Sequence, residues 1–148
     1  MFEFLLTLLV ISLVGINLIT IFGFKAKTNE NLMLFQSLPV SFMYSLMFIA
    51  FPLQGYLFSG EDADTLGIGI LVVMPSILFV VVSMTILGIK GLTKWKAEND
   101  KFLLVTSLGS SFVILTLVFT HFLFPLVTLY ILGRKAVRKW KGNSEPIK

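Results

Sequence analysis

Four long apolar blocks, none with an internal Asp, Glu, Lys or Arg, make up most of this chain. They cover residues 4–24, 32–58, 66–89 and 102–133. A transmembrane helix needs about 20 apolar residues, and an unpaired charge at mid-bilayer costs at least ~2.5–3.5 kcal/mol. The blocks are continuous runs, unlike the ~10-residue alternating segments of a membrane β-barrel. The pattern predicts an all-α integral membrane protein with four transmembrane helices, multi-pass in a bacterial-type plasma membrane.

The composition agrees with a bilayer environment and excludes several other classes of protein. Hydrophobic residues make up 56% of the chain and charged residues 14%, against about 45–50% and about 25% in soluble domains. A disordered chain and a basic nucleic-acid-binding domain are excluded, so no nucleic-acid partner is expected. The sequence has no cysteine, which removes disulfides, thiol nucleophiles and Cys-ligated metals. We expect no cofactor and no metal.

Two halves of the chain resemble each other in order and spacing. The matching pairs are Thr20–Ala26 with Thr85–Gly91, Glu30–Phe42 with Asp100–Phe112, and Phe51–Leu53 with Phe124–Leu126. Chance similarity between apolar segments is the alternative, but Gly, Lys, Ser and Pro also fall in register. We therefore predict two tandem, internally duplicated hairpins that form one four-helix bundle over residues 1–133. Repeat 1 covers about 1–60, repeat 2 covers about 66–133, and a basic C-terminal tail follows over 134–148.

The fourth block is too long for an ordinary crossing. As one straight helix, residues 102–133 would measure about 48 Å, which exceeds the ~30 Å of hydrocarbon. The helix must therefore protrude, kink at Pro125, or fold back as a partly re-entrant segment. Leu115–Phe119 contains no turn signal, so a long, kinked single crossing is expected.

The basic residues divide evenly under this topology. Six Lys/Arg lie in Lys25–Asn31 and Lys90–Lys101, and six lie in the tail, which shares the other face with the N-terminus. The positive-inside rule therefore does not decide the orientation. The dense tail cluster favours both termini in the cytoplasm. A re-entrant fourth block would instead place all twelve basic residues on one side.

One ionisable side chain, His121, lies deep in an apolar block. Intramembrane ionisable residues are by default candidates for proton relay or ligand binding. Thr120 is its neighbour, and Asn17 and Gln36 add polar groups in other blocks. We take these four residues as a candidate intramembrane polar site. The alternative is that they form hydrogen bonds between helices, each worth ~0.6 kcal/mol.

Small residues recur at helical spacing along several blocks. They are Ser37, Ser41, Ser45, Gly69, Ser76, Ser83, Ser107 and Ser111. Small residues let helix backbones approach closely in membranes. We expect them to pack helices together; lining a polar path is the alternative.

The basic tail is a candidate binding surface for anionic lipid headgroups or for a partner. Its residues are Arg134, Lys135, Arg138, Lys139 and Lys141. Basic residues near an anionic membrane contribute ~1 kcal/mol each. A simple topology anchor is the alternative. The acidic residues Glu61, Asp62 and Asp64 are interpreted as a solvated turn, because the EF-hand pattern is absent.

No catalytic motif is present, so we expect no enzyme. The leading hypothesis is an accessory or scaffold subunit, or an immunity-type binding protein, that works through helix–helix contacts. Its partners would be the bilayer and either further copies of the chain or other membrane subunits. The alternative is a small oligomeric transporter or channel with a polar path near His121.

Overall fold

The computed structural model describes residues 2–57, 68–112 and 117–144, except the side chains of residues 68–69, 117–122 and 143–144. Within this part every element is helical, which confirms the all-α prediction. The elements are α1 (Phe2–Phe24), α2 (Asn29–Leu57), a π-helical turn η1 (Ile68–Val73), α4 (Met74–Glu98), α5 (Lys101–Ser111) and α6 (Leu117–Ser144).

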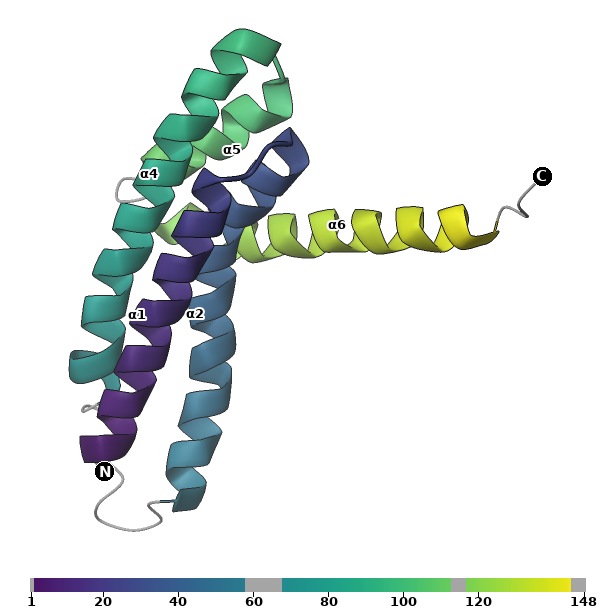
Figure 1. The fold of residues 1–148 in the computed structure, drawn as a ribbon. Coiled ribbons are helices and arrows are strands. Elements are labelled where there is room, and N and C mark those ends of the chain that lie inside the picture. Colours follow the sequence, from purple (N-terminus) through teal and green to yellow (C-terminus); the bar gives the residue numbers. More distant parts are fainter. Residues whose placement is uncertain (1, 58–67, 113–116, 145–148) are drawn as a thin grey trace.

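Three of the described segments are long and apolar enough to cross a membrane. They are Phe2–Phe24, Asn29–Leu57 and Ile70–Glu98, the last combining part of η1 with α4. They lie side by side and form the long body of the molecule (Figure 1). Ile16, Val40 and Met84 are buried where the three meet. The prediction of helices that are long and apolar enough to cross a membrane is therefore confirmed for three segments.

The outer surfaces of these helices are strongly apolar. Phe48 is 83% exposed and Leu78 is 66% exposed, and large apolar side chains cover the outside of α1 as well. A soluble protein rarely exposes so large a continuous apolar area. In a bilayer the same side chains face lipid.

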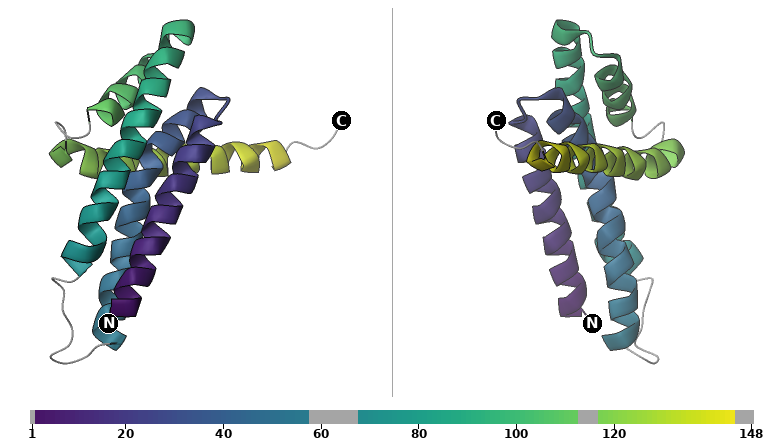
Figure 2. Two further views of the ribbon diagram at one scale, coloured as in Figure 1. Left: turned by 60° about the vertical axis from the view of Figure 1, so that its left-hand side comes forward. Right: turned by 90° about the vertical axis from the view of Figure 1, so that its right-hand side faces the viewer.

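The prediction of one continuous fourth helix is wrong. The block is divided into α5 and α6. Helix α5 has 11 residues, or about 16 Å of helix, which is too short to cross ~30 Å of hydrocarbon. It runs back along α4, and α6 runs across the bundle (Figures 1 and 2). The run Gly109–Ser111 near the end of α5 consists of poor helix formers, which favours a break there.

The start of the fourth block and the tail that follows it both contact the turn between α1 and α2 or the first turn of α2. Before α5, Asp100 accepts a hydrogen bond from Asn29. Near the end of α6, Arg138 pairs with Glu30, in the first turn of α2. The chain therefore leaves this end of the bundle in α5 and returns to it in α6. The expected four-helix count is not confirmed, and neither is the duplication, because α2 is continuous where its matching segment is divided.

The position of the tail also corrects the expected faces. Phe2 begins α1 at the end of the bundle opposite the α1–α2 turn, whereas α6 passes Gly133 into the tail and reaches that turn through Lys135 and Arg138 (Figure 1). The N-terminus and the tail therefore do not share a face.

The sharp turn between α4 and α5 has a clear local cause. Asn99 ends α4 in the left-handed conformation, with φ 53°, which Asn adopts more readily than most residues. Asp100 then caps α5, its carboxylate accepting from the backbone N–H groups of Phe102 at 3.0 Å and Leu103 at 3.3 Å. This turn directs α5 back along α4.

Candidate functional site

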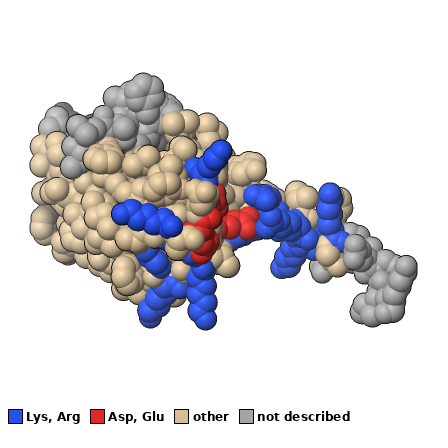
Figure 3. All heavy atoms as spheres, turned by 90° about the horizontal axis from the view of Figure 1, so that it is seen from above, with Lys and Arg blue, Asp and Glu red and all other residues tan. Residues whose placement is uncertain are grey.

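The described basic residues gather at the end of the bundle that carries the α1–α2 turn, and along α6. Figure 3 looks onto this end and shows Lys and Arg around a smaller acidic group and out along the projecting helix. We call it the charged end. Its basic residues are Lys25, Lys27, Lys90, Lys94, Lys96, Lys101, Arg134, Lys135, Arg138, Lys139 and Lys141, and its acidic residues are Glu30, Glu98 and Asp100.

Lys90 reaches the C-terminal end of α1. Its Nζ donates to the backbone oxygens of Gly23 at 3.2 Å, Ala26 at 3.3 Å, and Phe24. It also lies 5.1 Å from the centroid of the Phe24 ring. The last carbonyls of a helix have no intrahelical partner and carry partial negative charge, so a cation there is stabilising. Lys94 Nζ makes a similar bond to the Lys27 oxygen. In the sequence both lysines were informative about orientation only through the positive-inside rule.

Asn29 links the first turn of α2 to the α4–α5 turn. Its amide donates to a carboxylate oxygen of Glu98 and, at 3.4 Å, to Asp100. Lys94 lies 3.8 Å from Glu98 on the same helix. These contacts join the start of α2, the end of α4 and the start of α5. Nothing in the local sequence around Asn29 indicates them.

The five tail residues fall into two groups. Arg138 Nη1 lies 2.9 Å from Glu30 Oε2, and Lys135 Nζ donates to the side-chain oxygen of Asn31. These two hold α6 against α2. Arg134, Lys139 and Lys141 are exposed on the outside of α6. The structure therefore brings two of the predicted residues to the α1–α2 turn and leaves three on the surface.

Gln36 occupies the interior between α2, α4 and α5. It is fully buried, and its amide donates to the Leu87 oxygen at 3.0 Å and to Ser107 Oγ at 2.9 Å. Its Oε1 has no hydrogen-bond partner in the described part of the chain. Asn17, by contrast, is exposed and donates to Leu13 of its own helix at 2.8 Å. The side chains of Thr120 and His121 lie outside the described residues. The candidate polar site formed by these two residues with Asn17 and Gln36 therefore stays a prediction.

Most of the small residues lie where helices meet. Ser12 and Ser76 join α1 to α4 through an oxygen–oxygen contact of 2.5 Å, and Thr20 donates to Ser83 at 2.6 Å. The Thr128 hydroxyl on α6 lies 2.8 Å from those of both Ser37 and Ser41 on α2.

Helices α4 and α5 approach each other closely at Gly88. A Cβ added at Gly88 would lie 2.7 Å from the backbone nitrogen of Ser111 and 2.9 Å from the oxygen of Ser107. Ser45 differs from the other predicted residues, because it is exposed and donates to Ser41 of its own helix. The contacts of Gly69 lie outside the described residues, as do Glu61, Asp62 and Asp64.

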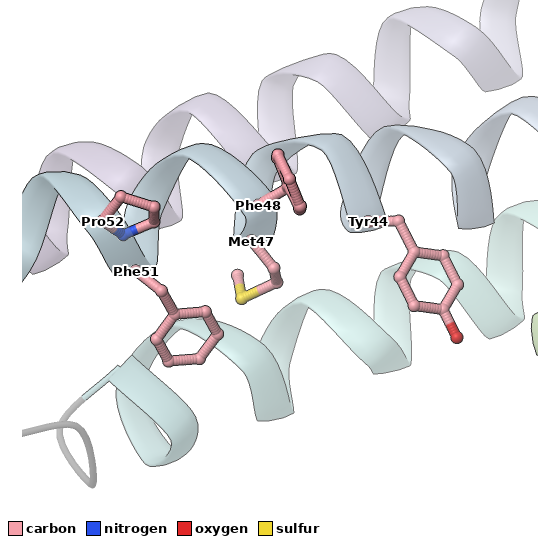
Figure 4. A pocket seen from close by; sticks show the side chains of 5 residues that line it. All are labelled: Tyr44, Met47, Phe48, Phe51 and Pro52. Atoms are coloured by element: carbon pink, nitrogen blue, oxygen red, sulfur yellow. The ribbon is translucent and has the colours of Figure 1, made fainter.

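An apolar hollow of about 400 Å³ opens on the side of α2. Tyr44, Met47, Phe48, Phe51 and Pro52 line it (Figure 4). Apolar carbon surrounds it almost entirely, so it suits an acyl chain or a neighbouring apolar side chain.

Among the described residues, no group of three or more His, Cys, Asp or Glu is placed to hold a metal ion. The arrangement provides packed polar contacts inside, apolar surfaces along the sides and a basic surface at one end. No protein-family model, curated protein or solved structure compared with this chain matches it.

Proposed function

We propose that this chain is a non-enzymatic accessory or scaffold subunit, or an immunity-type binding protein, that acts through helix–helix contacts in a membrane. The observation that carries this proposal is that polar groups in the interior form hydrogen bonds with one another between helices. Ser12 bonds to Ser76, Gln36 to Ser107, and Thr128 to Ser37. These groups hold the helices together, so what the molecule offers to another molecule is its outer surface.

The sides of α1 and α2 suit such contacts. Transmembrane helices associate by close packing of side chains. The hollow beside Tyr44 and Phe51 is a recess on an otherwise apolar side (Figure 4), and a side chain from a neighbouring helix fits its chemistry. The partner is a second copy of the chain or another membrane subunit.

Photo-crosslinking in native membranes tests this proposal. A photoreactive amino acid replaces Phe48, which is highly exposed beside the hollow. We expect one discrete crosslinked species, at twice the chain mass or at the mass of a second subunit. The matched control replaces Met84, which is fully buried, and should give no intermolecular product. Recovery of the Phe48 variant only as uncrosslinked monomer would contradict the proposal.

A small oligomeric transporter or channel is the second candidate. The observation that favours it is the buried Gln36, whose Oε1 lacks a partner within the described part of the chain and is available to a polar solute or water. Intramembrane polar groups of this kind mark pathways in transporters. This candidate requires flux across reconstituted vesicles that Gln36→Leu and His121→Ala both reduce. Vesicles that show no such flux would exclude it.

A further inference from the structure

Helix α6 separates apolar from basic side chains. At 100° per residue most of its exposed apolar residues fall on one side, and the basic residues Arg134, Lys135, Arg138, Lys139 and Lys141 fall outside that side. The exposed residues of the apolar side are Leu126, Leu129, Tyr130, Val137 and Trp140, and two further exposed leucines, Leu123 and Leu132, lie at the boundaries between the two sides. Leu129 is 67% exposed and Trp140 is 77% exposed. Such a helix is amphipathic along its projecting half.

The contacts of α6 show which way each side points. Lys135 bonds to Asn31, and Arg138 pairs with Glu30. The basic side is therefore turned toward the charged end. The apolar side, opposite on the helix, is turned away from that end. If α1, α2 and α4 span the bilayer, the apolar side of α6 faces hydrocarbon.

The direction of α6 fits the same placement. It runs across the bundle in each of the views, while α1, α2 and α4 run along it (Figures 1 and 2). A basic amphipathic helix in this direction lies in the plane of the interface, with its apolar face in the acyl region. Lys and Arg then extend to the headgroups, and tryptophan is favoured at this depth.

The charge at this end is strongly one-sided. Eleven basic residues stand against three acidic ones, a difference of 11 − 3 = 8 positive charges, in the described part. All three acids are already engaged, Glu30 by Arg138, Asp100 by Asn29, and Glu98 by Asn29 and Lys94. The basic surface therefore faces outward largely unneutralised, which suits an anionic ligand spread over a plane.

We propose that the charged end, with α6 lying along the membrane, is a binding surface for anionic phospholipid headgroups. Arg134, Lys139 and Lys141 contact headgroups directly, and Lys25 and Lys27 extend the surface at the α1–α2 turn. Lys135 and Arg138 position α6 through α2. The basic end then faces the cytoplasm, in accord with the positive-inside rule, and three crossings place the start of α1 on the opposite side.

Trp140 fluorescence tests the placement of α6. Trp95→Phe leaves Trp140 as the one tryptophan, and Trp95 Nε1 lacks a hydrogen-bond partner within the described residues, so phenylalanine suits that site. The full chain is reconstituted in phosphatidylglycerol vesicles with or without acyl-chain bromination. We expect strong quenching by the brominated lipid and weak quenching by aqueous iodide. Quenching by iodide alone would overturn the proposal, since α6 would then project into water.

Lipid binding tests the role of the charges. Native mass spectrometry compares phosphatidylglycerol with phosphatidylcholine on the full chain and on Arg134→Gln/Lys139→Gln/Lys141→Gln. We expect a preference for phosphatidylglycerol that falls roughly 10- to 100-fold in the variant. The matched control, Arg134→Lys/Lys139→Arg/Lys141→Arg, keeps the charge and should keep the preference. Equal binding of the two lipids by the unmodified chain, or an unchanged preference in the glutamine variant, would overturn the proposal.

Reporter fusions test the orientation. A reporter after residue 148 should report the cytoplasm, and one inserted at Glu61 should report the opposite side. The reverse result would place the basic surface on the outer leaflet and overturn the cytoplasmic assignment. Failure of the lipid-binding proposal would leave the Phe48 crosslinking result unchanged. The experiments therefore distinguish failure of lipid binding from failure of the proposed helix–helix contacts.

Discussion

Arg138 and Glu30 form an ion pair between residues 108 positions apart in the sequence, with 2.9 Å between Nη1 and Oε2. The pair joins the last helix to the first turn of α2. It lies beside the bond from Lys135 to Asn31. Together these contacts bring the basic tail to the same end of the molecule as the lysines of the α1–α2 turn.

A crosslink between these positions should form readily. The chain has no cysteine, so Glu30→Cys/Arg138→Cys introduces the only two thiols. We expect a short bis-maleimide to join them, which changes the gel mobility of the full chain in membranes. The matched control is Glu3→Cys/Arg138→Cys, with Glu3 at the other end of α1. Efficient crosslinking in the control, or none at Glu30, would contradict the return of α6 to the first turn of α2.

The ion pair itself should add little stability. Both partners retain exposure, with side chains 56% exposed for Arg138 and 24% for Glu30. Exposed pairs are worth ~0.2–1 kcal/mol. We expect Arg138→Gln to lower the free energy of unfolding in detergent by no more than about 1 kcal/mol, while proteolysis of α6 becomes faster. A loss several times larger would show that Arg138 has a structural role beyond this contact.

Gly88 should not accept a larger residue. A Cβ there meets backbone atoms of α5, so that helix must move. We expect Gly88→Ala to destabilise the protein by about 1–3 kcal/mol, as overpacking does in other cores. Gly133→Ala on α6 is the matched control, because nothing lies within 4 Å of a Cβ added at Gly133. It should be neutral or stabilising by up to ~1 kcal/mol. Thermal unfolding in detergent compares the two variants, and equal melting temperatures would contradict the close approach.

Gln36 and Ser107 should be energetically coupled. Their hydrogen bond is buried between α2 and α5. A double-mutant cycle of Gln36→Leu and Ser107→Ala should give a coupling of ~0.6–1.7 kcal/mol, the range for interhelical bonds in membranes. Asn17→Leu replaces Gln36→Leu in the control cycle, because Asn17 bonds only within α1 among the contacts described. A coupling near zero in the first cycle would be inconsistent with the bond.

Lys90 should stabilise the end of α1. Its ammonium donates to three backbone oxygens there. We expect Lys90→Met to cost about 1–2 kcal/mol, since hydrogen bonds to charged groups are stronger than neutral ones. Lys96→Met, at an exposed position on the same helix, should change stability by less than ~0.5 kcal/mol. Urea or thermal unfolding distinguishes them, and equal effects would argue against a specific role for Lys90.

Much of the membrane-spanning part was predictable from residue types. The first three apolar blocks correspond to Phe2–Phe24, Asn29–Leu57 and Ile70–Glu98, with ends that differ by at most four residues except at Glu98, which lies nine residues beyond the predicted end. The small residues also predicted helix packing, as Ser76 and Ser83 show. The roles of Lys90 and Asn29 were not predictable, because their partners lie more than 60 residues away in the sequence.

The sequence by itself determined where this chain is compatible with a bilayer, because a run of about 20 apolar residues without a charge is a property of the residue types alone. Only the tertiary structure decided the course of the fourth block. Its length and hydropathy suit a crossing as well as a return. The return depends on the close approach of α5 at Gly88 and on contacts of Lys135 and Arg138 with α2. Contacts of this kind join distant segments and leave no local pattern in the sequence.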